Sequence, residues 1–208
     1  GWDWGAVLPY FLKAENNQRG ASGLHAAGGP LQVANQSAPQ PISHAFVEAC
    51  AEAQIPPNSD FNGSPQAGAG LYQVTQFHDG PRRGERCSAA AAYLHPVMGR
   101  PNLTVLTRCL VERLQITEGR ATGVILRRGR QRSVIGARRE VILSAGAFGS
   151  PQILMLSGIG PAQELAAQGI AVQHDLPGVG QNLQDHLDYI LSYTSPRKDV
   201  VGLNPGGL

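Results

Sequence analysis

The stretch that decides the fold is EVILSAGAFGSPQILMLSGIG, residues 140–160. Its first part, residues 140–144, is a mainly apolar run, which predicts a buried strand of a parallel sheet. In the second part, Ser150 is a candidate cap, Pro151 falls in the first turn and Gly158 stands at the end, so a helix is predicted. A buried strand that leads directly into a helix is typical of α/β domains.

The turn between this strand and helix is built of small residues: Ala145, Gly146 and Ala147. Small side chains let a ligand approach the backbone closely, and the start of a helix offers unpaired N–H groups and the positive end of its dipole. Ala145 and Gly146 are therefore candidate contacts for a dinucleotide. The alternative is a tight structural crossover of the kind found in any α/β domain.

Outward from this segment the sequence alternates between strand and helix patterns. Alternating apolar residues predict strands over 105–114, 121–128 and 133–137, separated by glycine-containing turns, which is the pattern of an antiparallel meander. Further predicted elements are helices over 4–15, 43–53, 88–94 and 161–168 and a strand over 71–77. The predicted fold class is thus a mixed α/β chain.

Composition excludes several classes of function. The chain has 208 residues and a formal net charge of +2, so its overall charge does not favour nucleic acid or an anionic membrane as a partner. Arginines cluster over residues 127–139, which we interpret as the solvated face of a sheet, with a nucleic-acid patch as the alternative. No apolar run reaches the ~18 residues that a membrane-spanning helix needs. The three separated cysteines fit thiols in a reducing, cytoplasmic compartment.

No residue is predicted to be catalytic, and no metal site is predicted. The cysteines form no CxxC pair. His174 and His186 have a carboxylate beside them in the sequence, in Asp175 and Asp185, but adjacent residues seldom point toward each other. The serines lack a Gly-x-Ser-x-Gly context, and the glycine pairs lack the Gly-x-Gly-x-x-Gly order of a phosphate loop.

Ordered motifs along the chain resemble one family. Residues 146–160 match a signature of the glucose-methanol-choline (GMC) oxidoreductases, and residues 140–145 and 176–186 are similar to that family in the same order. Upstream, DFNG at 60–63, LYQVTQ at 71–76, AYLHP at 92–96 and RPNLTVLT at 100–107 resemble the branch that holds choline dehydrogenases and aliphatic or polyethylene-glycol alcohol dehydrogenases.

The resemblance implies an FAD enzyme that passes hydride from a primary alcohol to flavin N5, with oxygen or a membrane quinone as the electron acceptor. It implies part of an FAD-binding Rossmann-like domain and part of an antiparallel-sheet substrate domain. By position, Val111 matches a valine whose backbone meets the adenine end of FAD, and Ala145 and Gly146 match the small turn close to the cofactor. Asn182 is expected on the flavin side of the site.

The resemblance also implies a division of the chain and a limit to its activity. Residues 1–100 correspond mostly to the substrate domain, residues 101–180 to part of the FAD domain, and residues 181–208 to the start of a second substrate-domain segment. The family's phosphate loop and its carboxy-terminal catalytic histidine have no counterpart here, so we expect an internal fragment that is inactive alone. The alternatives are a non-catalytic binding domain left by truncation, and a lyase on the same fold.

Overall fold

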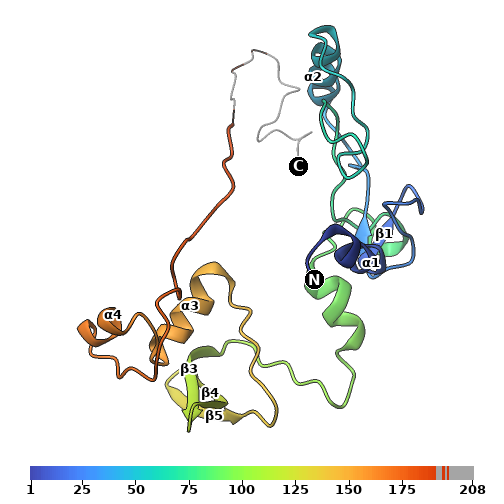
Figure 1. The fold of residues 1–208 in the computed structure, drawn as a ribbon. Coiled ribbons are helices and arrows are strands. Elements are labelled where there is room, and N and C mark those ends of the chain that lie inside the picture. The colour runs from blue at the N-terminus through green and yellow to red at the C-terminus, as the bar shows by residue number, and fades with distance from the viewer. Residues whose placement is uncertain (191–193, 195, 197–208) are drawn as a thin grey trace. The chain divides into compact units, whose positions relative to one another are not determined.

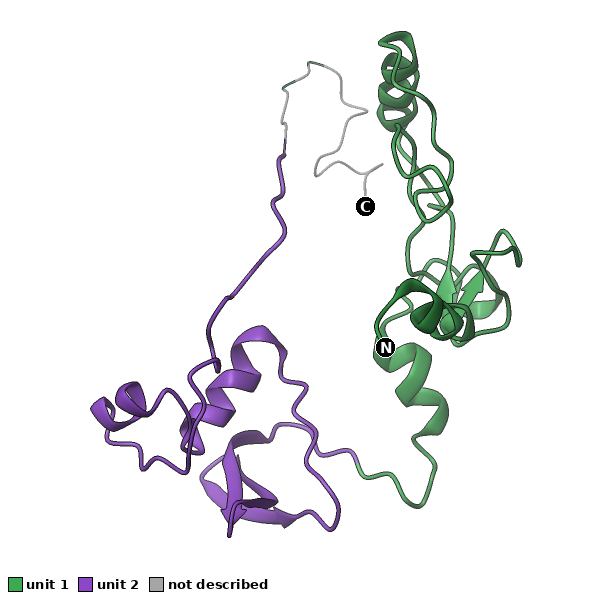
Figure 2. Cartoon of the chain, in the orientation of Figure 1, with its two compact units in different colours: residues 1–104, 192–208 green, residues 105–191 purple. Residues whose placement is uncertain are grey.

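The structure is a computed structural model that describes residues 1–190, 194 and 196, and it contains two compact units (Figures 1 and 2). Of the described residues, 1–104, 194 and 196 belong to unit 1 and 105–190 to unit 2. Helices and sheets occur in both units, which confirms the mixed fold class.

Unit 1 begins with helix α1, Trp4–Ala14, which was predicted from the sequence. Asp3 caps this helix because its carboxylate accepts a hydrogen bond from the backbone N–H of Ala6 at 3.1 Å. The chain leaves α1 directly into β1, Glu15–Asn17, which pairs in parallel with β2, Leu31–Val33. Residues 18–30 form the loop that connects these two strands.

Helix α2, Pro41–Glu52, starts two residues ahead of its predicted position because Pro41 occupies its first turn, where a missing N–H costs nothing. Among the other described residues of unit 1, the helical elements are the short turns η1 at Gly80–Arg82, η2 at Ala90–Leu94 and η3 at His95–Val97. The strand predicted over 71–77 is wrong. Only isolated bridges form there, from Val74 to Ala34 and from Gln76 to Arg86, because the backbone has no continuous partner.

Unit 2 is built around the predicted antiparallel meander. Its strands are β3, Leu110–Thr117, β4, Arg120–Arg128, and β5, Gln131–Gly136, in the order β3-β4-β5. β3 starts later than predicted and carries two register shifts against β4. Leu114 and Leu126 are the buried hydrophobic side chains of this sheet.

Helix α3, Gly146–Leu156, packs against β3 and is followed by β6, Ile159–Gly160, helix α4, Ala162–Ala167, and β7, His174–Asp175. The prediction that Ser150 caps α3 is wrong, since the helix already begins at Gly146. The Ser150 hydroxyl instead accepts a hydrogen bond from the backbone N–H of Ala145 at 3.0 Å. Gly158 follows the helix with a φ of +82°, the left-handed conformation that ends helices.

The buried parallel strand predicted at residues 140–144 is not formed. These residues have no regular secondary structure, and the Ile142 side chain is 76% exposed. A strand exists only where a neighbour accepts and donates its ladder hydrogen bonds, and no described residue takes that place beside this segment. The apolar pattern indicates that this segment can form a strand, but it becomes one only when a neighbouring strand supplies the hydrogen-bond partners.

The buried Ser157 joins α3 to the meander. Its hydroxyl oxygen accepts a hydrogen bond from the backbone N–H of Leu114 at 2.8 Å and donates its own hydrogen to the carbonyl of Ile153. We expect Ser157→Ala to destabilise unit 2 by about 1–3 kcal/mol, because it leaves a buried N–H without a partner. Amide hydrogen exchange at Leu114 measures this loss, and Ser133→Ala on the exposed strand β5 is the matched control. Unchanged exchange at Leu114 would contradict the role given to Ser157.

Large apolar side chains are exposed in both units, including Trp4 and Phe11 on α1 and Phe148 on α3. Within the described part of the chain, no helix combines the length and apolar character required for crossing a bilayer.

Candidate functional site

The turn at the start of α3 has the properties expected of a backbone that lies close to a ligand. Ala145 and Gly146 are exposed, and no side chain caps the helix here. Gly146 has a φ of +82°, and a Cβ placed on it would meet no atom within 4 Å. The first N–H groups of a helix have no intrahelical acceptor, so this end of α3 can donate hydrogen bonds to an acceptor outside the protein.

A pocket of about 540 Å³ lies beside this turn. Helix α3 contributes Ala147, Phe148, Pro151 and Met155 to its wall, and residues 180–184 form the other side. Asn182 belongs to this second group and has a φ of +55°, a left-handed conformation that asparagine tolerates better than most residues. The structure therefore places Asn182 in one pocket with Ala147 and Phe148, the residues that follow Gly146, while Ala145 and Gly146 themselves do not line it.

Val111 lies at a different place. It pairs with Leu126 in the meander and lines a pocket of about 490 Å³ between β3 and α3, together with Gln152, Ile153 and Leu156 of the helix. Of the four predicted cofactor residues, Asn182 and Val111 thus line two different pockets of unit 2, and both pockets lie along α3. Ala145 and Gly146 line neither pocket, although the next residue, Ala147, lines the first. Both pockets are of the size that small-molecule sites have.

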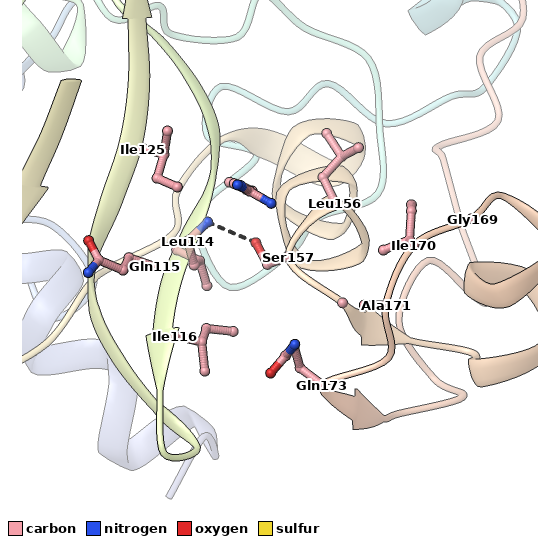
Figure 3. A pocket seen from close by; sticks show the side chains of 12 residues that line it. Leu114, Gln115, Ile116, Ile125, Leu156, Ser157, Gly169, Ile170, Ala171 and Gln173 are labelled. Atoms are coloured by element: carbon pink, nitrogen blue, oxygen red, sulfur yellow. Dashed lines mark hydrogen bonds between the residues drawn. The ribbon is translucent and has the colours of Figure 1, made fainter. Parts of the chain in front are cut away.

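A third hollow of unit 2, about 530 Å³, contains none of the predicted residues. It lies between β3 and the chain that follows α3, and Figure 3 shows the hydrogen bond from Leu114 to Ser157 beside Ile116, Ile170 and Gln173. Its polar groups at this point are already paired with each other. We assign no function to this hollow.

The arginine cluster lies in solvent. All of its arginines are exposed, which agrees with the interpretation as a solvated face. Arg127 and Arg132 are direct cross-strand neighbours, and their mutual repulsion is relieved by Glu112, whose carboxylate accepts from Arg127 at 3.0 Å and from Arg132 at 2.7 Å. The hydrogen bond from Arg132 holds the pKa of Glu112 below its ordinary value of 4.5. Its contribution to stability is present above pH 4.5 and is lost as the pH falls through the lowered pKa.

Sequence reasoning missed a polar cluster in unit 1. His25 lies between two carboxylates, with its Nδ1 3.1 Å from Glu15 and its Nε2 3.0 Å from Asp60. The two ring nitrogens face opposite directions, so the three side chains cannot share one metal ion, and no metal-binding group occurs among the described residues. These residues are too far apart in the sequence for any spacing rule to group them.

Comparison with known proteins gives a consistent family. The chain is 46% identical over 197 residues to the oxygen-dependent choline dehydrogenase of Sinorhizobium medicae (strain WSM419), which covers 95% of this chain and 35% of that protein. It is 43% identical over 205 residues to an alcohol dehydrogenase [acceptor] of Pseudomonas putida, covering 97% and 36%. The chain therefore spans about a third of the length of the curated relatives it matches.

Solved structures agree with these relatives. Pyridoxine 4-oxidase from Mesorbium loti superposes with a TM-score of 0.76 at 32% identity, covering 85% of this chain and 34% of that one. An FAD-dependent oxidoreductase from Chaetomium thermophilum has a TM-score of 0.76 at 31% identity, covering 89% and 34%. Residues 1–188 match the sequence profile described as GMC oxidoreductase. This chain belongs to the GMC oxidoreductase family.

Proposed function

We propose that this chain is the central part of an FAD-dependent oxidoreductase that oxidises a primary alcohol to an aldehyde. One observation carries the proposal: the small-residue turn at Ala145 and Gly146 opens α3 beside a pocket whose opposite wall contains Asn182. The chain belongs to the GMC oxidoreductases, and this membership supports the interpretation of the turn and the pocket as part of a flavin site.

The residues of unit 2 fit such a cofactor. Ala145 and Gly146 leave space at the turn, where a Cβ on Gly146 would meet no neighbour, and the uncapped N–H groups of α3 can donate to it. The amide of Asn182 can donate a hydrogen bond on the flavin side, and the backbone near Val111 would meet the adenine end. When bound, FAD supplies the acceptor for the hydride that leaves the alcohol.

The names of the relatives support a proposal for the substrate, and two electron acceptors are proposed beside it. Their names include choline dehydrogenase and alcohol dehydrogenase [acceptor], so we propose a small alcohol as the substrate. Oxygen or a quinone would take the electrons, and a quinone would require a peripheral position at the inner membrane. We assign no catalytic residue to this chain, because both ring nitrogens of His25 are engaged and no other described histidine pairs with a carboxylate. The isolated chain is accordingly proposed to be inactive.

The test is spectroscopic. The complete product of the gene, purified without added flavin, is expected to show flavin absorbance that bleaches when choline or another primary alcohol is added without oxygen. The 208-residue chain alone is the comparison and is expected to show no turnover with added FAD. A complete product without flavin would instead favour a non-catalytic binding domain. A bound flavin that no alcohol reduces, with a non-redox product formed, would favour a lyase.

A further inference from the structure

The cluster around His25 has a hydrogen-bond geometry that a neutral ring between two ionised carboxylates does not satisfy. Nδ1 of the ring lies 3.1 Å and 3.2 Å from the two carboxylate oxygens of Glu15, and Nε2 lies 3.0 Å from Asp60. A neutral imidazole has one N–H, so one of its nitrogens would direct a lone pair at a carboxylate. The doubly protonated ring donates to both sides.

The amide of Asn17 leads to the same conclusion. Asn17 is 3% exposed, and its Nδ2 lies within 3.1 Å of three groups: Glu15 at 2.9 Å, Gln73 at 3.0 Å and Nδ1 of His25. An amide nitrogen has only two hydrogens. If Nδ1 carries a proton, both amide hydrogens go to Glu15 and Gln73, and no acceptor in the cluster is left without a donor.

The cluster ties together two loops that are distant in the sequence. His25 and the backbone N–H of Ala26, which donates to Glu15 at 2.8 Å, lie in loop 18–30. Asp60 lies in loop 56–70, which is closed on itself by the bridge between Pro57 and Ala69. The only other link that the described residues show between the two loops is the hydrogen bond from the Arg19 guanidinium to the carbonyl of Ser59.

We propose that the doubly protonated ring of His25 is a clasp that holds loop 18–30 against loop 56–70, and that loss of its second proton opens this link. The ionisable groups that face the ring are Glu15 from β1 and Asp60 from loop 56–70, and Arg19 is the cation nearest to them along loop 18–30. If Glu15 or Asp60 holds this proton in place of the ring, the cluster contains the same number of protons. Its hydrogen bonds need that proton in either case.

The direction of the pH dependence follows from the surroundings of the ring. Burial alone would lower the pKa of His25, but the hydrogen bonds and negative charges of Glu15 and Asp60 outweigh it and raise the pKa above 6.5. A raised pKa means that the folded loops bind the proton more tightly than the unfolded chain does. The stabilisation is therefore complete below pH 6.5, decreases as the pH rises from there, and is absent above the raised pKa.

Hydrogen exchange of the 208-residue chain tests the clasp. Between pH 6 and pH 9, after correction for the intrinsic exchange rate, protection of peptides from both loops is expected to fall together, over the range in which the ring resonance of His25 titrates. His25→Gln is expected to reduce protection at pH 6 on the order of tenfold, because hydrogen bonds to charged groups are the stronger ones. It should also remove the pH dependence of both loops.

Two further variants keep the test decisive. Asp60→Asn is expected to move the titration of His25 to lower pH, since it removes one of the two charges that hold the proton. His44→Gln, on the exposed surface of α2, is the matched control and should leave both loops unchanged. Loop protection that stays constant through the titration of His25 overturns the proposal. So does a pH dependence that survives in His25→Gln, and if that variant misfolds, the wild-type titration and Asp60→Asn decide.

Discussion

Valine in place of Gly146 is expected to abolish tight FAD binding by the complete gene product. The backbone of Gly146 has a φ of +82°, which a β-branched residue adopts only with strain of about 1–2 kcal/mol. The added side chain would also occupy the open space beside the start of α3, where we propose that the cofactor approaches. Together these effects should raise the Kd for FAD more than about tenfold, measured by flavin fluorescence or titration calorimetry.

Gly169→Val separates strain from contact with the cofactor. Gly169 follows α4, has a φ of +69° and also has no neighbour within 4 Å of an added Cβ, so the substitution imposes a similar backbone strain elsewhere in unit 2. It is expected to lower stability while leaving the Kd for FAD almost unchanged. Equal retention of FAD by both variants would remove the turn at Gly146 from the proposed site.

Alanine in place of Gly70 is expected to disrupt loop 56–70. A Cβ on Gly70 would lie 2.9 Å from the carbonyl carbon of Asn58 and closer still to the carbonyl oxygen, and a backbone group cannot yield as a flexible side chain can. Asn58 is itself buried, and its amide donates to the carbonyl of Pro65 at 2.7 Å. Overpacking of this kind costs about 3 kcal/mol.

The measurement is hydrogen exchange or limited proteolysis of loop 56–70, which should become much more accessible in Gly70→Ala. Gly99→Ala is the matched control in unit 1, because an added Cβ there has no neighbour within 4 Å and the backbone has no positive φ. A loop that stays as protected as in the wild type would show that the backbone at Asn58 moves aside more easily than the structure indicates.

Elements with local signals were predictable. Helix α1 has a regular apolar spacing and Asp3 before it, and the meander has glycine turns between alternating strands. The predicted strands at 71–77 and 140–144 failed for one reason. Their apolar residues suit a strand, but the hydrogen bonds of a strand also need a neighbouring strand that is distant in the sequence. The local pattern does not show whether that neighbour is present.

The proposed site also contains some residues that local sequence signals indicate and others that they do not. Ala145 and Gly146 could be picked out because small residues let a ligand approach the backbone, whereas Asn182 and Val111 were implied only by the family resemblance. The structure places Asn182 in one pocket with Ala147, the residue after Gly146. Their roles toward FAD stay predictions. Glu15, His25 and Asp60 could not be found, since the pairing of a histidine with distant carboxylates depends on how two loops fold back on each other.

The sequence by itself determined the family, the mixed fold class and most helices, because motif order and local periodicity are properties of neighbouring residues. The tertiary structure alone decided which residues share a pocket with the start of α3 and that His25 lies between two acids. Hydrogen bonds and charges act over a few ångströms in space, whatever the separation along the chain, and only folding brings these groups within that distance.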